Sequence, residues 1–247
     1  MNSTTAAQAF ADAASRMVSR SDVAGDLVML LVDCADLLGA QAAGLLVTVP
    51  NDGLDLLSSS SHRARELELY ELQHGSGPCI EAIRTGEQRT VTSPELGTAW
   101  PPLGGKIVAN GFHSVHAFPL NWHGTAIGAL NVFHTDPLVL DDGDRLLAQT
   151  FADLATAVVA QPLDNGVTSL RDQIMAAIEG RTVIEQAKGI IAFRENLEMG
   201  DAFSRLLELA ATSGRPLSRV AGDILTSVSR SVGRDQYDPG VDGPEEV

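Results

Sequence analysis

The spacing of hydrophobic and polar residues predicts a mixed region of helices and strands over residues 21–161. Alternating apolar and polar positions are typical of strands, and apolar residues three and four positions apart are typical of helices. The chain lacks a repeated strand–helix–strand unit, which favours a mainly antiparallel sheet with helices on its faces. The predicted strands span residues 42–49, 54–60, 88–92, 113–120 and 125–134. The predicted helices span residues 5–19, 62–73, 78–86, 103–110 and 141–160, with another from the Ser21-Asp22 cap to Gly39. Residues 93–102 are predicted to form a loop.

A second pattern begins after Pro162 and Asn165-Gly166, which mark the predicted domain boundary. From about Val167 to Arg230 the spacing predicts three helices, the second over residues 200–212 and the third from Pro216. The last residues are acidic and rich in Pro and Gly, which is typical of disorder. We therefore expect an N-terminal helix (1–20), an α+β domain (21–161), an all-α three-helix domain (162–230) and a disordered acidic tail (231–247).

The first helix of the C-terminal domain changes its apolar face along its length. At about 100° per residue, three apolar residues near its start lie on the same side as a polar stripe of Arg181, Glu185 and Lys188. The later apolar residues lie on another side, which indicates two packing partners. The second half would pack in the three-helix bundle, and the first half against a second chain or a helix of the first domain. The predicted interface of a homodimer consists of Leu170, Ile174 and Ile178.

The net charge of −15 is spread unevenly along the chain. Residues 1–166 carry 8 Lys/Arg and 19 Asp/Glu, whereas residues 167–230 carry 8 of each and are neutral. A neutral region attracts polyanions only weakly, so nucleic-acid binding there must depend on a few placed cations. The cations predicted to be exposed in this region are Arg181, Lys188, Arg194, Arg215 and Arg219.

Composition and termini predict a cytoplasmic protein without a membrane span. No run of about 18 apolar residues is present, and the N-terminus lacks the basic and apolar segments of a secretory signal. Two cysteines, Cys34 and Cys79, have no CxxC spacing, which favours a reduced compartment.

The histidines and cysteines form no recognisable metal or catalytic motif. His113 and His116 stand three positions apart on a predicted strand, so their side chains point to opposite faces. The sequence lacks the nucleophile-elbow, dinucleotide-binding and P-loop motifs. The segment from Asp141 to Asp144 lacks the Glu that a calcium loop has at its twelfth position. We therefore predict no metal site and no enzyme activity.

A ligand pocket on the predicted sheet would be lined by inward residues of the strands 113–120 and 125–134 and by the segment 93–104. Ordinary core packing is the alternative interpretation of each residue, and the ligand itself is not predicted. The candidate lining residues are Cys79, Trp100, His116, Phe118 and Trp122.

Two resemblances give these regions a function. The segment RTVIEQAKGII from Arg181, together with Ala202-Phe203 and Val220-Ala221, resembles the ANTAR output domain of bacterial regulators. This resemblance implies binding of paired RNA stem-loops and prevention of transcription termination, with Arg181 and Lys188 as the main RNA contacts. The family's Ser-Gln pair and Lys before the third helix are absent here, where Pro216 replaces the Lys and Arg215 is the adjacent cation.

The segments GSGPCIEAIRTGE, HSVHAFPL and AIGALNVF resemble the GAF domains of actinobacterial GAF–ANTAR regulators. This resemblance implies a six-stranded antiparallel sheet with a small-molecule pocket on one face and dimerising helices on the other. The expected protein is a homodimeric regulator in which a GAF-type sensor controls an RNA-binding ANTAR domain. The alternative is a sensor and dimerisation module that acts by protein–protein contact without RNA, which the neutral charge and the altered entry to the third helix favour.

Overall fold

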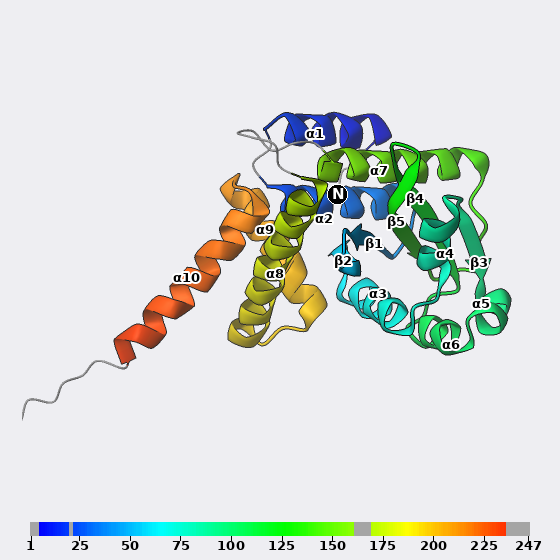
Figure 1. Cartoon of the computed structure of the whole chain (residues 1–247). Coiled ribbons are helices and arrows are strands. Elements are labelled where there is room, and N and C mark those ends of the chain that lie inside the picture. Colours follow the sequence, from blue (N-terminus) through cyan, green and yellow to red (C-terminus); the bar gives the residue numbers. More distant parts are fainter. Residues whose placement is uncertain (1–4, 20–21, 161–168, 236–247) are drawn as a thin grey trace, which may run out of the picture. The chain divides into compact units, whose positions relative to one another are not determined.

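The structure is a computed structural model that describes residues 5–19, 22–160 and 169–235. Its elements follow the chain in the order α1 (Ala6–Ser19), α2 (Val23–Leu37), β1 (Ala42–Val49), β2 (Gly53–Ser59), α3 (His62–His74), α4 (Pro78–Thr85), β3 (Arg89–Thr92), α5 (Ser93–Ala99), α6 (Pro101–Ala109), β4 (Ser114–Trp122), β5 (Thr125–His134), α7 (Asp142–Ala160), α8 (Leu170–Glu195), α9 (Met199–Ser213) and α10 (Leu217–Asp235) (Figure 1). By its contacts the chain divides into two compact units between Thr182 and Val183, inside α8.

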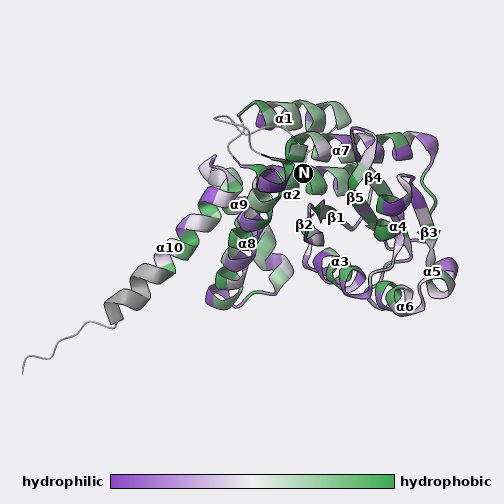
Figure 2. Ribbon diagram, viewed as in Figure 1, coloured by the Kyte–Doolittle hydropathy of each residue, from purple (hydrophilic) through white to green (hydrophobic). Residues whose placement is uncertain are grey.

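The first unit is built on an antiparallel sheet with the strand order β2-β1-β5-β4-β3. Its central strands, β1 and β5, are buried along most of their length because helices cover both faces. Hydrophobic residues accordingly run along β5, whereas α8 shows hydrophobic and hydrophilic stretches in turn (Figure 2). The predicted α+β fold with an antiparallel sheet, followed by a helical region, is confirmed.

One face of the sheet is covered by α1, α2, α7 and the first half of α8. Alternate β1 residues, among them Leu45 and Val47, pack there against Leu31 of α2, Phe151 of α7 and other side chains of one continuous core. The phenyl rings of Phe10 and Phe151 meet with centroids 5.2 Å apart, so α1 is part of this core. The predicted N-terminal helix therefore packs against the rest of the first unit.

The other face of the sheet is covered by α3, α4, α5 and α6. Two smaller clusters lie there, one around Phe112 and Phe133 and one around Leu46 and Cys79. The phenyl rings of Phe112 and Phe133 are 5.4 Å apart. This face also buries two carboxyl side chains, those of Glu68 and Glu71 on α3.

Three expectations about the elements are corrected. Residues 93–102 were expected to form a loop, but they contain α5 and the start of α6. Pro94 lies in the first turn of α5 and Pro101 in the first turn of α6, and proline at these positions favours helix initiation. The described sheet has five strands where the family resemblance implied six. The predicted disordered tail began at residue 231, but α10 continues to Asp235. Residues 236–247 and the predicted boundary at Pro162 and Asn165-Gly166 lie outside the described residues.

The second unit comprises the end of α8 with α9 and α10. Ile184, Ala187 and Ile191 of α8 are buried, as are residues of the other two helices. Gly214 ends α9 with a φ of 63°, a left-handed conformation that glycine adopts at little energetic cost. The buried residues contributed by α9 and α10 are Ala202, Phe203, Leu206, Leu217, Val220 and Ala221.

Candidate functional site

Lys188, predicted to be an exposed cation, is instead buried, with 2% of its side chain accessible. Its ammonium group donates to Oε1 of Glu185 at 2.8 Å and lies 4.9 Å from the ring centroid of Phe203 on α9. The carboxylate supplies a counter-charge and the ring face attracts the cation. Lys188 therefore joins α8 to α9, and the expectation that it faces solvent is wrong.

Arg181 is also turned toward protein, with 20% of its side chain exposed. Its guanidinium Nη1 lies 3.4 Å from Oδ1 of Asp55 on β2. Arg181 and Lys188 lie on the inward side of α8, where Ile174, Ile184 and Ile191 are buried. The polar stripe predicted as an exposed face is thus embedded in the packed face of α8.

The other three predicted RNA-binding cations are exposed in the second unit. Arg194 of α8 donates to Oγ of Ser227 on α10 at 3.2 Å. Arg215 pairs with Asp223 at 2.6 Å, with 51% and 62% of the two side chains exposed. Arg219 lies one helical turn after Arg215 and is exposed. An ion pair as exposed as that of Arg215 contributes little, so an RNA phosphate can compete with the carboxylate.

The predicted dimer stripe is buried inside a single chain. Ile174 is fully buried and Ile178 is 9% exposed. Both belong to the core that contains α2 and α7, and the partly buried Leu170 packs against it. Of the two partners considered for this half of the helix, the structure shows the helices of the first unit. The assignment of these three residues to a dimer interface is therefore corrected.

The five candidate pocket residues do not converge on one cavity, because they lie on opposite faces of the sheet. Phe118 and Trp122 pack in the core under α2 and α7. His116 precedes them by even steps on β4 and shares their face. Cys79 and Trp100 belong to the two clusters on the opposite face. Only Cys79 and Trp100 therefore lie on the face covered by α3–α6.

His116 and His134 form a buried pair on the sheet. Their ring centroids are 5.3 Å apart, Nδ1 of His116 lies 3.1 Å from the hydroxyl of Thr90, and Nε2 of His134 lies 3.1 Å from the carbonyl oxygen of Leu38. Burial lowers the pKa of His116 to about 4, with His134 adding to the effect, and burial also lowers the pKa of His134. Both rings are therefore neutral at pH 7 and act as packed hydrogen-bonding groups.

Two buried carboxyl groups on α3 are a feature that the sequence interpretation missed. Glu68 is fully buried and accepts from Nδ2 of Asn131 on β5 at 3.0 Å. Glu71 is 3% exposed and accepts from the backbone N–H of Ile80 at 3.0 Å. Its carboxylate thereby caps α4, whose own N-cap residue Gly77 provides no side-chain hydrogen bond.

Glycines make room for both carboxyl groups. A Cβ atom on Gly44 of β1 would stand 2.3 Å from Oε1 of Glu68. A Cβ atom on Gly77 would stand 2.4 Å from the carboxyl group of Glu71. The two glutamates therefore fill space that side chains at these glycines would occupy, so the site is packed rather than open.

The electrostatics of this cluster favour bound protons. Burial raises the pKa of Glu68 well above its usual value, and the neighbouring Glu71 raises it further. Burial raises the pKa of Glu71 to about 7, although hydrogen bonds from the α4 backbone oppose the shift. Burial likewise raises the pKa of the Cys79 thiol, which donates to the carbonyl oxygen of Ala129 at 3.5 Å. A protonated Cys79 is a poor nucleophile and acts here as a buried donor.

A signal for the carboxyl pair was present in the sequence. The buried residues of α3 are Ala64, Leu67, Glu68 and Glu71, at the spacing of one apolar helix face. The two glutamates continue the buried face of the helix, which indicates that their carboxyl groups are buried. Hydropathy values alone place them on the exposed surface.

Two further properties of the described residues concern metals and membranes. Within residues 5–19, 22–160 and 169–235, no group of three or more His, Cys, Asp and Glu side chains is placed to hold a metal ion. No helix in the same ranges has both the length and the hydropathy needed to cross a bilayer.

Family comparisons match both parts of the chain. The family model for the GAF domain matches residues 7–160, and the model for the ANTAR domain matches residues 172–225. GAF domains are sensor domains, and ANTAR domains are RNA-binding antitermination modules. The comparison with curated protein sequences gave no match.

Solved structures resemble the first unit. The GAF domain of a phosphoenolpyruvate-protein phosphotransferase from Coxiella burnetii has a TM-score of 0.51 and 16% identity, over 65% of this chain and 95% of its own. The GAF domain of an Acinetobacter phosphoenolpyruvate-protein phosphotransferase has a TM-score of 0.48 and 13% identity, over 62% and 92% of the two chains. At 16% identity, the likeness to the Coxiella domain indicates a shared fold alone.

Proposed function

The chain belongs to the GAF family and carries an ANTAR domain after its GAF domain, and on this basis we propose that it is a regulator that prevents transcription termination. In this proposal the ANTAR domain binds paired RNA stem-loops, and the GAF domain controls that binding. The match of the ANTAR model to residues 172–225 is the observation that carries the proposal. Because antitermination acts on nascent bacterial RNA, the proposed location is the cytoplasm.

The proposed RNA surface uses Arg194, Arg215 and Arg219, the exposed members of the predicted set. Lys188 is excluded from it because its ammonium group is buried against Glu185 and Phe203. Arg181 is a weaker candidate, because its guanidinium pairs with Asp55. Three exposed cations per chain imply a small number of phosphate contacts and a shallow dependence of affinity on salt.

A homodimer remains part of the proposal, with an interface outside Leu170, Ile174 and Ile178. Residues 167–230 carry no net charge, so a single domain binds RNA weakly. Two linked domains that engage two stem-loops raise the apparent affinity without new contacts. Dimerisation therefore explains how a neutral ANTAR domain binds usefully.

In this proposal the GAF domain binds a small-molecule ligand. The face of the sheet under α3–α6 carries the buried polar groups of Glu68, Glu71, Cys79 and Asn131, and these groups fill the space between the sheet and the helices. The opposite face is filled by the core that includes Phe118 and Phe151.

The alternative function, docking of a partner protein by the ANTAR domain, is favoured by one observation. Phe193 of α8 is 89% exposed, and exposed aromatic side chains are common at protein interfaces. Variants of this residue can therefore distinguish an RNA partner from a protein partner.

The test of the proposed function begins with RNA crosslinked to the full-length protein in its native host. Sequencing should recover transcripts that carry two adjacent stem-loops. In gel-shift titrations with the recovered tandem stem-loop RNA, Arg215→Ala combined with Arg219→Ala should weaken binding and make the salt slope shallower by about 0.7–0.9 for each phosphate that the protein no longer neutralises. The matched control is Arg145→Ala, which removes a half-exposed arginine on α7 that pairs with Asp142. Equal binding by wild type and the double variant would exclude this surface, and recovery of no enriched RNA would reject RNA binding.

A further inference from the structure

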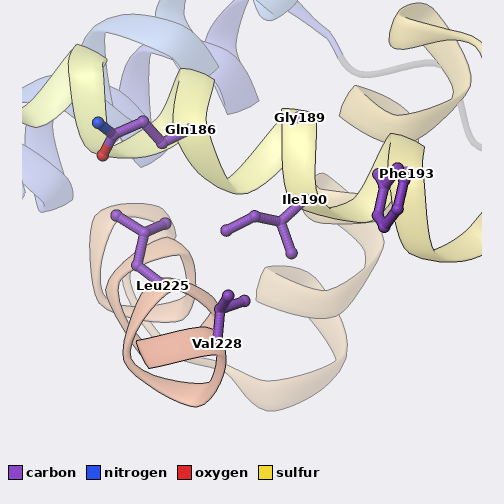
Figure 3. Close-up of a pocket in the computed structure, with 6 residues that line it drawn as sticks. All are labelled: Gln186, Gly189, Ile190, Phe193, Leu225 and Val228. Carbon is purple, nitrogen blue, oxygen red and sulfur yellow. The ribbon is translucent and has the colours of Figure 1, made fainter. Parts of the chain in front are cut away.

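The second unit has an apolar groove between α8 and α10, with a volume of about 520 Å³ (Figure 3). The side chains of Ile190, Leu225 and Val228 point into the space between the two helices. Gln186 lies at one end of the α8 side and Phe193 at the other (Figure 3). The groove is lined by Gln186, Gly189, Ile190, Phe193, Leu225 and Val228.

Phe193 offers an aromatic surface beside this groove. Its side chain is 89% exposed, which leaves the phenyl ring in water at a cost in free energy. Among the described Phe, Tyr and Trp residues it alone is exposed, since Tyr70, Trp100 and Trp122 are each partly buried. An exposed phenyl ring next to an apolar hollow is suited to stacking with a flat ligand.

Gly189 has no side chain, so the backbone of α8 itself lines this part of the groove. It is exposed in the interior of α8, and a Cβ atom there would meet no other atom within 4 Å. Packing within the chain therefore does not require glycine, although glycine in a helix interior is less stable than alanine by about 1 kcal/mol. A glycine at this position leaves the backbone of α8 open to close approach by a flat ligand.

Polar groups stand at the ends of the apolar lining. Gln186 is exposed and carries an amide that can both donate and accept hydrogen bonds. Arg194 follows Phe193 directly, and its bond to Oγ of Ser227 holds the guanidinium between α8 and α10. An aromatic face, an amide and a cation are the groups that bind an unpaired stretch of RNA, through the face of a base, a polar group of a nucleotide and a phosphate.

We propose that the groove receives one unpaired base from the loop of a bound RNA stem-loop. The base stacks on Phe193 over Gly189, and a neighbouring phosphate lies against Arg194. The amide of Gln186 lies two helical turns before Phe193, so it meets an adjacent nucleotide. This inference rests on the proposed RNA binding and names the part of the RNA that the groove recognises. It also supplies affinity that the neutral charge of residues 167–230 does not.

The charges around the groove favour RNA over a second copy of the chain. Glu185, Glu195 and Asp223 lie close to it in sequence, and each already pairs with Lys188, Arg205 or Arg215. In a symmetric dimer through this groove, Arg194 of each copy would meet carboxylates that are already paired with these cations. An RNA phosphate supplies the missing anion.

The test is a double-mutant cycle that uses the tandem stem-loop RNA recovered by crosslinking. Each loop nucleotide is replaced in turn by an abasic nucleotide, and binding to full-length protein is measured by gel shift. At one loop position the abasic change should weaken wild-type binding roughly 5- to 100-fold, the range expected for loss of one stacked base. Phe193→Ala should weaken binding of intact RNA by a similar factor, and the abasic change should then have no further effect.

Matched variants separate stacking from other roles of Phe193. Phe193→Trp should retain binding, because an aromatic face remains, whereas Phe193→Leu should bind as weakly as Phe193→Ala. Leu146→Ala on α7 removes another exposed apolar side chain, which is 70% exposed, and should leave RNA binding unchanged. Unchanged circular dichroism and melting temperature would confirm that the variants are folded, as expected for an exposed position.

Each failure has a distinct meaning. If wild type binds the RNA and Phe193→Ala binds it equally well, the base-docking inference is wrong and RNA binding stands. If Phe193→Ala halves the sedimenting mass while Phe193→Leu preserves it, the groove joins two copies of the chain and the inference is again overturned. If the wild type binds no stem-loop RNA, the proposed function itself fails.

Discussion

The two units each bury charged side chains, but they neutralise them in different ways. In the ANTAR domain the cation of Lys188 lies between the carboxylate of Glu185 and the ring of Phe203, so a counter-charge is built into the fold. In the GAF domain, Glu68 and Glu71 are buried with an amide, a thiol and backbone groups, and the described residues place no cation against them. Binding of a proton must then neutralise the buried carboxyl groups, as the counter-ion neutralises Lys188 in the other unit. The comparison teaches that a buried charge without a counter-ion makes the stability of the GAF domain depend on pH.

The largest expected effect is at Lys188. Lys188→Ala should lower the free energy of unfolding by about 3 kcal/mol, because it removes a buried stem and breaks the ion pair with Glu185. Lys188→Met keeps the stem and should cost about 1 kcal/mol. Urea unfolding followed by circular dichroism measures both. The control is Arg181→Ala on the same helix, which breaks a more exposed pair and should cost about 0.5–1 kcal/mol. Equal losses for the Ala and Met variants would show that charge, rather than packing, dominates at this position.

A smaller effect is expected at Glu68. Oε2 of Glu68 and Oδ1 of Asn131 are both buried, and no described residue donates a hydrogen bond to either. A proton on Glu68 would let its hydroxyl donate to the amide oxygen, so Glu68→Gln should retain wild-type stability at pH 5. Glu68→Ala should cost about 2 kcal/mol, because it leaves the buried Asn131 amide without a partner. Thermal melting of the two variants at pH 5 tests this, and a Gln variant as unstable as the Ala variant would argue that Glu68 is ionised.

The smallest expected effect is the dependence of stability on pH. The pKa of Glu71 rises from 4.5 to about 7 on folding, so the folded chain binds this proton more tightly than the unfolded chain does. The stabilisation is complete below about pH 4.5 and is lost as the pH rises through about 7. Glu71→Gln keeps an acceptor for Ile80 and removes the titration, so the wild type should lose on the order of 1–2 kcal/mol relative to this variant between pH 5 and pH 8. Urea titrations at both pH values measure the difference. Buried His116 and His134 titrate with the opposite sign below about pH 6.5, and they cancel in the comparison because both proteins contain them.

The sequence predicts the elements well where one physical pattern dominates. The strands over residues 42–49 and 125–134 agree with β1 and β5 at both ends, because a long apolar run between turn residues has a single good interpretation. The segment 93–102 was misread because its prolines were taken as loop residues, although proline also fits the first turn of a helix. A short helix carries too few residues for its periodicity to decide the matter.

The candidate site was harder to predict, because the sequence shows charge and not its partner. The helical wheel places Arg181 and Lys188 on one stripe correctly, but the assignment of that stripe to solvent rested on their charge alone. Asp55 and Phe203 lie 126 positions before Arg181 and 15 positions after Lys188, and only the fold brings each pair together. Glu68 and Glu71 escaped notice for the same reason, since the atoms they meet belong to Asn131 and Ile80.

The hydrogen bond from Ile80 to Glu71 makes the stability of α4 depend on α3. The α4 helix has eight residues and receives its side-chain cap from the preceding helix rather than from Gly77. Whenever α3 opens, the cap is lost, and so short a helix is marginal by itself. The two helices should therefore open as one cooperative unit, and the backbone amide of Ile80 should exchange with deuterium at the rate set by the opening of α3.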